Sequence, residues 1–310
     1  MNFINTSSVN NGIKTDTEKY ITLSENIYLS QIKEAAEKIC ADRIEKPIVL
    51  ISGPSGSGKT TSALKIAAVI REKGIKVKTV SMDNYFLPSD MGELPVDENG
   101  NIDLEAPERL DIKLFSEDLK KISECQPIEI PVFDFTTQLR SGSIPMQREK
   151  DGIVIIEGIH ALNPAVTGNA ADDFSHRIYI SVRTRVISDD NTTLHPSVIR
   201  LMRRLCRDRL FRGRKLPDIF EMFTSVSRGE DLYIMPHKHR ASMDIDTFIP
   251  YELSVYSALL LSDLLNVKSI MKDSENYRQT VKFLSEMLPL NDSAVPEASL
   301  IREFIGGGSF

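Results

Sequence analysis

The sequence is poor in cysteine and in long apolar runs, and it has no excess of positive charge; each of these observations narrows the class of protein. Its three cysteines, Cys40, Cys125 and Cys206, are scattered and form no C-x-x-C pair. This usage favours free thiols in a reducing compartment. The net charge is −6, so the chain as a whole is not expected to attract nucleic acid or an anionic membrane surface.

No apolar run approaches the roughly 20 residues that span a membrane. The N-terminal residues also lack the basic and then apolar pattern of a signal peptide. We therefore expect a cytoplasmic protein without a membrane or nucleic-acid partner. The remaining composition, 41% hydrophobic and 26% charged, is that of an ordinary globular protein. A chain of 310 residues forms one large domain with appendages or two small domains.

The most informative stretch is GPSGSGKT at residues 53–60, which fits the pattern G-x-x-x-x-G-K-[ST]. The apolar run before it predicts a buried strand, and residues 62–70 predict a helix after it. In such a loop, backbone N–H groups and the helix N-terminus bind a polyphosphate. We expect Lys59 to reach the β- and γ-phosphates of a nucleotide and Thr60 to hold Mg²⁺. The expected nucleotide-binding set is Gly53, Pro54, Ser55, Gly56, Ser57, Gly58, Lys59, Thr60 and Thr61.

Apolar runs alternate with helical patterns along the rest of the chain, which predicts a parallel sheet with helices on both faces. The first residues, rich in Asn, Ser and Thr, are expected to form a mobile tail. The alternating segment 128–135 predicts a short strand or one arm of a hairpin. The strands of the sheet are predicted at residues 48–51, 77–81, 153–156, 177–182 and 245–249.

Two acids follow predicted strands. Asp83 comes just after residues 77–81, and Glu157 comes directly after residues 153–156. Ligands bind at the carboxyl ends of the strands in an open parallel sheet, so both acids should lie beside the phosphate loop. Asp83 is a candidate base for an attacking hydroxyl, although it could instead form an Asx turn with Asn84. Glu157 is a candidate Mg²⁺ site, although it could instead be a strand-end acid that faces solvent.

A basic run lies near residue 200 and contains one acid, Asp208. Its basic members are Arg200, Arg203, Arg204, Arg207, Arg209, Arg212, Arg214 and Lys215. The first four are spaced i, i+3, i+4, i+7 and share one helix face. We expect a mobile arginine-rich lid that closes over a transferring phosphoryl group, because guanidinium groups stabilise the charge on its oxygens. A nucleic-acid patch is the alternative, but Phe211 is its one interleaved aromatic.

Six segments occur in the order GPSGSGKTT, SMDNYF, DLEAPERLD, VFDFTTQLR, VIIEGIHALNP and RRLCRDRLFRGR. Over residues 47–270 they resemble the uridine kinase branch of the phosphoribulokinase/uridine kinase family. The resemblance implies an α/β P-loop NTPase fold, with a five-stranded parallel sheet, helices on both faces and the arginine-rich lid. It further implies phosphorylation of a nucleoside 5′-hydroxyl by ATP or GTP with Mg²⁺. Relatives of this kind often form tetramers, so a homo-oligomer is compatible with the resemblance.

Composition, helical patterns and the resemblance together divide the chain into a mobile N-terminal tail (1–27), a P-loop kinase domain (28–272) and a C-terminal helix and tail (273–310). The resemblance also assigns residues. The implied catalytic residues are Asp83 as the base, Lys59, and the lid arginines Arg207, Arg212 and Arg214. The implied metal residues are Thr60 and Glu157. The implied acceptor-side residues are Asp83, Tyr85, Glu105, Phe133, Gln138 and Arg204.

The chain departs from the family pattern at base-recognition positions. Family pyrimidine kinases have Tyr and His where this chain has Phe133 and Gln138. Their ring-stacking Phe falls at Leu104, and a lid-side Gln falls at Met222. A site that hydrogen-bonds a uracil edge discriminates through such groups. The transfer machinery therefore matches, while the choice of acceptor is open.

Three hypotheses follow from the sequence. The first is an ATP:nucleoside phosphotransferase, with uridine as the leading acceptor. The second is the same chemistry on another small alcohol, such as a different nucleoside or a sugar phosphate. The third is a nucleotide-binding regulator with little catalysis. Asp83 speaks against the regulator, and the altered acceptor positions keep the second hypothesis open.

Overall fold

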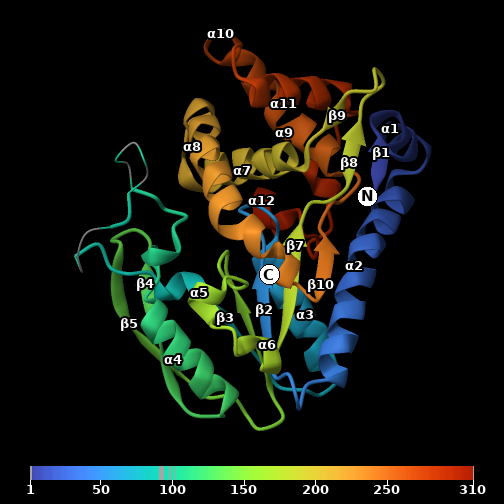
Figure 1. The fold of residues 1–310 in the computed structure, drawn as a ribbon. Helices are drawn as coiled ribbons and strands as arrows, with labels where there is room; N and C mark the ends of the chain where they lie inside the picture. The colour runs from blue at the N-terminus through green and yellow to red at the C-terminus, as the bar shows by residue number, and fades with distance from the viewer. Residues whose placement is uncertain (1, 91–93, 97, 99, 101, 310) are drawn as a thin grey trace.

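The computed structural model describes residues 2–90, 94–96, 98, 100 and 102–309 of the chain. Its centre is a parallel sheet of five strands in the order β10-β7-β2-β6-β3 (Figure 1). These strands are β2 (Ile48–Ser52), β3 (Val77–Ser81), β6 (Ile153–Glu157), β7 (Ser175–Ser181) and β10 (Met243–Asp246). The predicted five-stranded parallel sheet is therefore confirmed, with some strand ends shifted by up to three residues.

The central strands are apolar along their whole length because both faces of the sheet are covered. Alternate residues of β2 enter two different cores. Val49 and Ile51 join a core formed with α2 (Thr17–Ala41), α3 (Lys59–Glu72) and the helices around α9 (Glu252–Asn266). Ile48 and Leu50 enter the other core, which includes α4 (Ile112–Ser123). The sheet thus forms the rigid middle layer that presents its carboxyl edge to the loops.

The remaining elements lie around this layer (Figure 1). The other helices are α1 (Thr6–Thr15), α5 (Pro164–Thr167), α6 (Ala171–Phe174), α7 (Pro196–Arg212), α8 (Leu216–Gly229), α10 (Lys268–Met271), α11 (Glu275–Glu286) and α12 (Arg302–Ile305). The segment predicted at 128–135 forms β4 (Ile128–Asp134), which pairs with β5 (Leu139–Met146) as an antiparallel hairpin. A small third sheet joins β1 (Phe3–Asn5), β8 (Arg185–Ile187) and β9 (Thr193–Leu194).

The N-terminal segment differs from the predicted mobile tail. It forms β1, α1 and the first part of α2, and Val9 and Ile13 are buried in the larger core. The polar residues that suggested a tail instead end and connect helices. The carboxylate of Asp16, for example, caps α2 by accepting from the N–H of Lys19, as N-cap residues do. The amide side chain of Asn10 binds the backbone near α11 at both Glu286 and Leu288.

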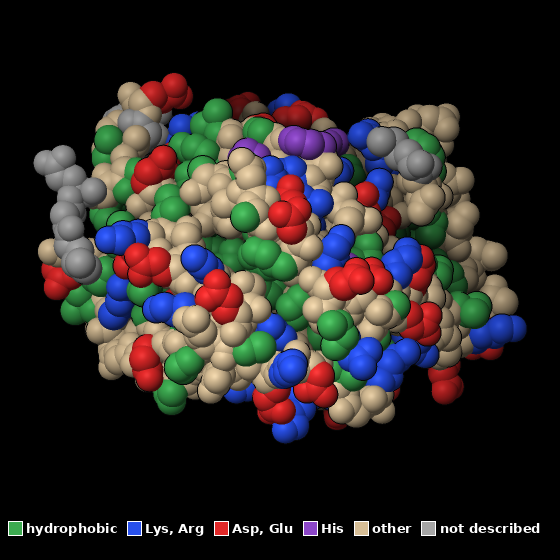
Figure 2. All heavy atoms as spheres, turned by 60° about the horizontal axis from the view of Figure 1, so that its bottom comes forward, with side chains coloured by type: hydrophobic (Ala, Val, Ile, Leu, Met, Phe, Trp, Pro, Cys, Tyr) green, Lys and Arg blue, Asp and Glu red, His purple; other side chains and the backbone are tan. Residues whose placement is uncertain are grey.

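Charges of both signs are mixed on the surface. On the face drawn in Figure 2, Lys and Arg side chains lie among Asp and Glu side chains rather than forming a separate basic area. Among the described residues, no helix combines the length and the apolar character needed to cross a membrane.

Candidate active site

The phosphate loop joins the carboxyl end of β2 to the N-terminus of α3. Gly56 and Gly58 have φ values of +73° and +83°, which L side chains rarely adopt. Gly53 approaches β7 so closely that a Cβ there would stand 1.9 Å from the carbonyl oxygen of Ile180. α3 begins at Lys59, whose Nζ donates to the carbonyl of Pro54 at 3.1 Å. The loop therefore requires glycine at these positions, and backbone groups rather than bulky side chains line it.

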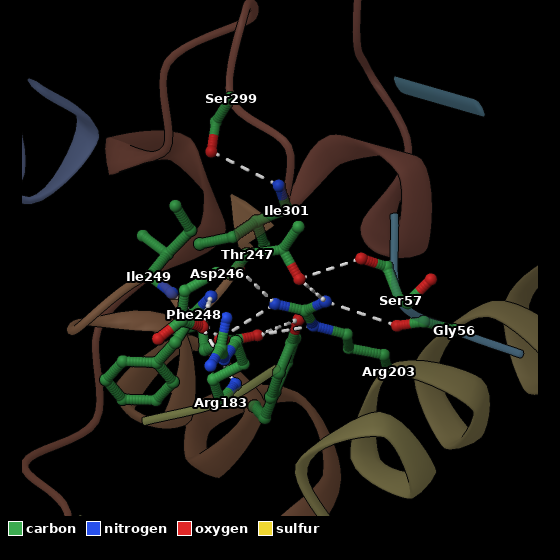
Figure 3. Close-up of polar contacts among 12 residues, drawn as sticks. Gly56, Ser57, Arg183, Arg203, Asp246, Thr247, Phe248, Ile249, Ser299 and Ile301 are labelled. Carbon is green, nitrogen blue, oxygen red and sulfur yellow. Dashed lines mark hydrogen bonds and ion pairs between the residues drawn. The ribbon is translucent and has the colours of Figure 1, made fainter. Parts of the chain in front are cut away.

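A buried arginine, Arg203, connects the loop at Gly56 to Thr247 (Figure 3). Arg203 and Glu252 are both 0% exposed, and two guanidinium nitrogens donate to the carboxylate at 2.8 and 3.0 Å. The same guanidinium donates to the carbonyl oxygens of Gly56 at 3.2 Å and Thr247 at 2.6 Å. The hydroxyl of Thr247 in turn donates to the carbonyl of Ser57 at 2.7 Å. Arg203 thus fixes the loop and is not a lid residue.

Arg200 is a second structural arginine. Its guanidinium donates to the two carboxylate oxygens of Glu230 at 2.6 and 2.7 Å and to the carbonyl of Ser55 at 2.9 Å. Glu230 also accepts from the N–H of Ser55 at 3.0 Å. Two of the four arginines that share a helix face therefore support the loop, because acids from other elements pair with them.

A cavity of about 230 Å³ opens inside the loop, and we call it the donor cavity. It brings together Lys59 and Thr60 from the loop, Asp83 from the turn after β3, and Glu157 from the end of β6. Adjacent strands explain the meeting of the acids, because Ser81 in β3 is the pairing partner of Glu157. The full lining is Ser55, Gly56, Gly58, Lys59, Thr60, Asp83, Phe86, Leu104, Glu105, Glu157, Ile159, Arg204, Arg207, Arg212 and Glu303.

Two opposing effects act on the pKa values of the strand-end acids Asp83 and Glu157. Burial raises the pKa of the Asp83 carboxyl, and the charge of Lys59 opposes that rise. Burial also raises the pKa of Glu157, where Lys59 again opposes the rise and Asp83 adds to it. In the described part of the chain, the Asp83 carboxylate makes no hydrogen bond to a backbone N–H, so the Asx turn considered from the sequence is not formed.

Metal binding at these acids would need a ligand beyond the side chains that the described residues place there. Among the described residues, no three His, Cys, Asp or Glu side chains lie close enough together to hold an ion. Mg²⁺ is commonly bound by one or two carboxylates together with substrate phosphates. Thr60 and Glu157 line the same cavity, so their side-chain oxygens fit a metal ion that binds together with a polyphosphate.

A larger cavity of about 610 Å³ adjoins the donor cavity and shares residues with it, including Glu105 and Arg204. We call it the acceptor cavity. Its lining is Phe86, Ile102, Leu104, Glu105, Arg109, Phe133, Phe135, Thr136, Gln138, Arg204, Arg212, Arg214, Met222, Ser225 and Val226. The four positions that depart from the family pattern all lie here. The structure therefore brings the altered residues together at one place, next to the transfer site.

Glu105 stands between the two cavities. Burial, and then the negative charge of Glu230, raise its pKa to about 7. The nearby cations of Arg204 and Lys59 oppose this rise. A carboxyl group with this pKa changes charge near neutral pH, so the binding of any hydroxyl beside it should depend on pH.

Tyr85 is not brought to either cavity. It is 1% exposed, its hydroxyl donates to Asp118 at 3.1 Å, and its ring meets Phe115 edge-on at 5.1 Å. The neighbouring Phe86 lines both cavities instead. The 3-10 turn after β3 (Met82–Tyr85) directs Tyr85 into the core under α4.

Four of the remaining arginines of the basic run surround one buried acid, whereas Arg209 pairs with Asp263. Asp208 is 0% exposed, and its carboxylate lies 2.8 Å from Nε of Arg207 and 3.3 Å from Nη1 of Arg212. Arg204 and Arg214 each approach it to 3.7 Å. Burial alone would raise the pKa of Asp208, but these cations hold it below its usual value. Asp208 thus holds the arginines that were expected to form the lid beside the acceptor and donor cavities.

Sequence reasoning missed three acids of the site. Asp208 was visible as the one acid within the basic run, which is a local signal for an organising carboxylate. Glu230 and Glu303 gave no such signal, because they reach the phosphate loop from distant positions. Glu303 accepts from the N–H of Thr61 at 3.3 Å and from its hydroxyl at 2.5 Å.

Fold and site together define a phosphate-loop kinase of the α/β class: a parallel sheet, a loop on a helix N-terminus, and acids at neighbouring strand ends. The model of the Phosphoribulokinase / Uridine kinase family matches residues 48–252. The chain belongs to this family, and it is therefore an ATP-dependent phosphotransferase.

Several named proteins are similar to this chain. The chain is 32% identical to a uridine kinase from Lactobacillus helveticus, over 65% of this chain and 87% of that protein. It is also 32% identical to a uridine kinase from Borrelia duttonii, over 74% of this chain and 98% of that protein. Among solved structures, a D-glycerate 3-kinase from Cryptococcus neoformans matches with a TM-score of 0.48 and 15% identity, covering 66% and 88% of the two chains.

Proposed function

We propose that the protein transfers the γ-phosphoryl group of ATP to the 5′-hydroxyl of a nucleoside, with uridine as the first acceptor to test. The observation that carries the proposal is the junction of the two cavities. Asp83 lies in the donor cavity, and the donor cavity shares Glu105 and Arg204 with the acceptor cavity. A hydroxyl held at the junction would therefore meet both a base and a phosphoryl group.

In the proposed reaction the acceptor oxygen attacks the γ-phosphorus, and Asp83 accepts the hydroxyl proton. The bond from the γ-phosphorus to the β–γ bridging oxygen breaks, and ADP leaves with that bond's electrons. Thr60 and Glu157 would hold Mg²⁺, which neutralises charge between the β- and γ-phosphates. Lys59 with Arg207, Arg212 and Arg214 would stabilise the charge that spreads over the transferring group. GTP remains an alternative donor.

An anionic acceptor such as a sugar phosphate is a second candidate, and one residue favours it. Arg109 is 3% exposed and lines the acceptor cavity. Its Nη2 donates to Gln138 at 3.4 Å, while Nε and Nη1 have no hydrogen-bond partner among the described residues. Burial lowers its pKa, and its guanidinium lies 5.5 Å from the centre of the Phe86 ring. A buried cation without a carboxylate is stabilised by an anion.

The test is a panel assay with MgATP against nucleosides, sugar phosphates and pantothenate, following both ADP and the phosphorylated product. Turnover of uridine or cytidine above the rest supports the first candidate. Turnover of a sugar phosphate that falls in Arg109→Met supports the second. ATP binding with no acceptor phosphorylated would instead favour a nucleotide-binding regulator.

The role of Asp83 has its own test. Asp83→Asn keeps the size of the side chain and removes the base, so we expect turnover to fall by at least ~10². Nucleotide binding, measured by calorimetry without acceptor, should stay within a few-fold of the unmodified protein. Turnover equal to that of the unmodified protein would remove Asp83 from this role.

A further inference from the structure

The C-terminal segment, residues 298–306, lies directly on the phosphate loop. Leu300 is 0% exposed and packs so closely that a Cβ on Gly58 would stand 2.7 Å from its Cδ1. Phe304 is also 0% exposed, and the guanidinium of Arg203 lies 5.1 Å from the centre of its ring. Nζ of Lys65, on the second turn of α3, donates to the carbonyl of Ala298.

Glu303 brings a negative charge to the start of α3. Its carboxylate accepts from both the N–H and the hydroxyl of Thr61. The first N–H groups of a helix lack partners within the helix and attract anions. Glu303 also lines the donor cavity beside Lys59 and Thr60. The carboxylate thus accepts hydrogen bonds from groups that, in a phosphate loop, donate to phosphate.

The order of residues in the loop indicates which phosphate is affected. In this pattern the backbone N–H groups cradle the α- and β-phosphates, the lysine reaches the β- and γ-phosphates, and the Thr hydroxyl meets Mg²⁺. Lys59 and Thr60 thus serve the β- and γ-phosphates, which leaves Thr61 for the α-phosphate. One N–H cannot serve a carboxylate and an α-phosphate together, and the two negative charges repel each other at contact distance.

We propose that the C-terminal segment competes with the nucleoside and α-phosphate part of the donor, with Glu303 in the place of the α-phosphate. Leu300 and Phe304 then cover the surface next to the loop where the rest of the nucleotide would lie. The proposal deepens the assignment of a nucleoside triphosphate as donor and rests on it.

The size of the donor cavity agrees with this competition. Its volume of about 230 Å³ lies below the roughly 300–1,000 Å³ of typical ligand pockets. Its lining is polar and includes Lys59, Arg207 and Arg212, which suits two phosphate groups. A nucleoside triphosphate has to move residues 298–306 aside, whereas pyrophosphate does not.

The test compares two probes, MgADP and magnesium pyrophosphate, by calorimetry without acceptor. The variants are Glu303→Gln and Glu303→Ala, which remove the charge of this partly buried carboxylate and leave the buried Leu300 and Phe304 in place. Glu297→Gln is the matched control, because Glu297 is an exposed acid directly before this segment, and its side chain makes no hydrogen bond or ion pair with a described residue of the loop. Loss of the competing charge should lower the Kd of MgADP about tenfold, the factor that ~1.4 kcal/mol represents.

The Kd of pyrophosphate should stay within about twofold in both Glu303 variants, because the β and γ positions are open in either state. A higher Kd for MgADP in these variants would overturn the proposal, since Glu303 would then be part of the nucleotide site. Equal shifts for both probes, or the same shift in Glu297→Gln, would also overturn it and indicate a general charge effect. Failure of MgADP to bind in any variant would overturn both this proposal and the assigned donor.

A second measurement uses the unmodified protein. Hydrogen exchange of the amides in residues 298–306 should become faster when MgADP is bound and stay unchanged with magnesium pyrophosphate. Slower exchange with MgADP would overturn the competition and show that the segment closes on the nucleotide.

Discussion

Replacing Asp208 by Asn is the sharpest test of how the arginine cluster is built. The change keeps the shape of the side chain and removes the one negative charge that four arginines share. Asp208 is 0% exposed, so the carboxylate itself has no contact with solvent. We expect the variant to fold less stably and the lid arginines to spread apart.

The magnitude follows from the burial of the partners. A pair at 4 Å with an effective dielectric constant of 20 attracts by roughly 4 kcal/mol before desolvation is counted. The side chains of Arg204 and Arg207 are 6% and 19% exposed, whereas Arg212 and Arg214 are 49% and 37% exposed. The last two pairs are screened by solvent and contribute little. Breaking the buried part should therefore cost ~3 kcal/mol, at the lower end for buried ion pairs.

The assay is unfolding in urea at pH 7, supported by thermal unfolding, where ~3 kcal/mol corresponds to a fall in Tm of roughly 6–12 °C. The control is Asp263→Asn, which breaks a half-exposed pair with Arg209 on the same helix and should cost less than ~1 kcal/mol. Because the folded-state pKa of Asp208 lies below its ordinary value of 3.8, its stabilisation is present above that pH. The difference from the unmodified protein should therefore shrink as the pH falls through and below 3.8.

An anion should partly replace the missing carboxylate. We expect magnesium pyrophosphate to raise the Tm of Asp208→Asn more than that of the unmodified protein, since it supplies charge to the same guanidinium groups. A variant that unfolds within ~0.5 kcal/mol of the unmodified protein, the range of ordinary surface changes, would refute the inference that Asp208 organises the cluster.

Three further predictions follow from the site. The pKa of Glu105 is about 7 in the folded protein, whereas its ordinary value is 4.5. The free energy of unfolding should therefore fall as the pH rises from 4.5 to 7, because the folded state disfavours the ionised carboxylate. Glu105→Gln should therefore raise the Tm at pH 8 but not at pH 4, and should flatten the acceptor's kcat/KM against pH; an unchanged profile would remove Glu105 from acceptor binding. Glu252→Gln should cost about 3–5 kcal/mol in urea unfolding because it leaves Arg203 buried and unpaired, and a loss below ~1 kcal/mol would contradict that. Arg207→Ala should lower kcat more than it raises the acceptor's KM; the reverse would make the cluster a docking surface.

The sheet and the phosphate loop could be predicted because their signals are local. A continuous apolar run, a glycine pattern and an acid at a strand end can each be recognised within a few consecutive residues. Asp83 and Glu157 could be placed together for the same reason, since parallel strands bring their carboxyl ends to one edge. These parts of the site depend on the order of elements, which the sequence contains directly.

The N-terminal helices and the contact of Glu303 could not be predicted on that basis. Asn, Ser and Thr suggest disorder by composition, yet in α1 and α2 the apolar residues between them, such as Val9, Ile13 and Tyr28, reach the core. Helices of this kind are stable through tertiary packing rather than through their own propensity. Thr61 and Glu303 are 242 positions apart, and no local pattern connects them.

The arginine run shows how one local pattern can divide into two functions. Its spacing predicted a single face with a single role, but acids outside the run decide the role of each guanidinium. Glu252 and Glu230 neutralise Arg203 and Arg200, so these two add no net charge to the donor cavity.

Around Asp208 the balance is different, because four arginines approach one carboxylate. Among the described residues this leaves three positive charges without a carboxylate of their own, and Arg204, Arg207 and Arg212 line the donor cavity. In a chain of net charge −6, this is a local excess of positive charge. Long-range attraction of anions by the whole molecule is weak, so we expect a polyphosphate to bind at this site rather than elsewhere on the surface.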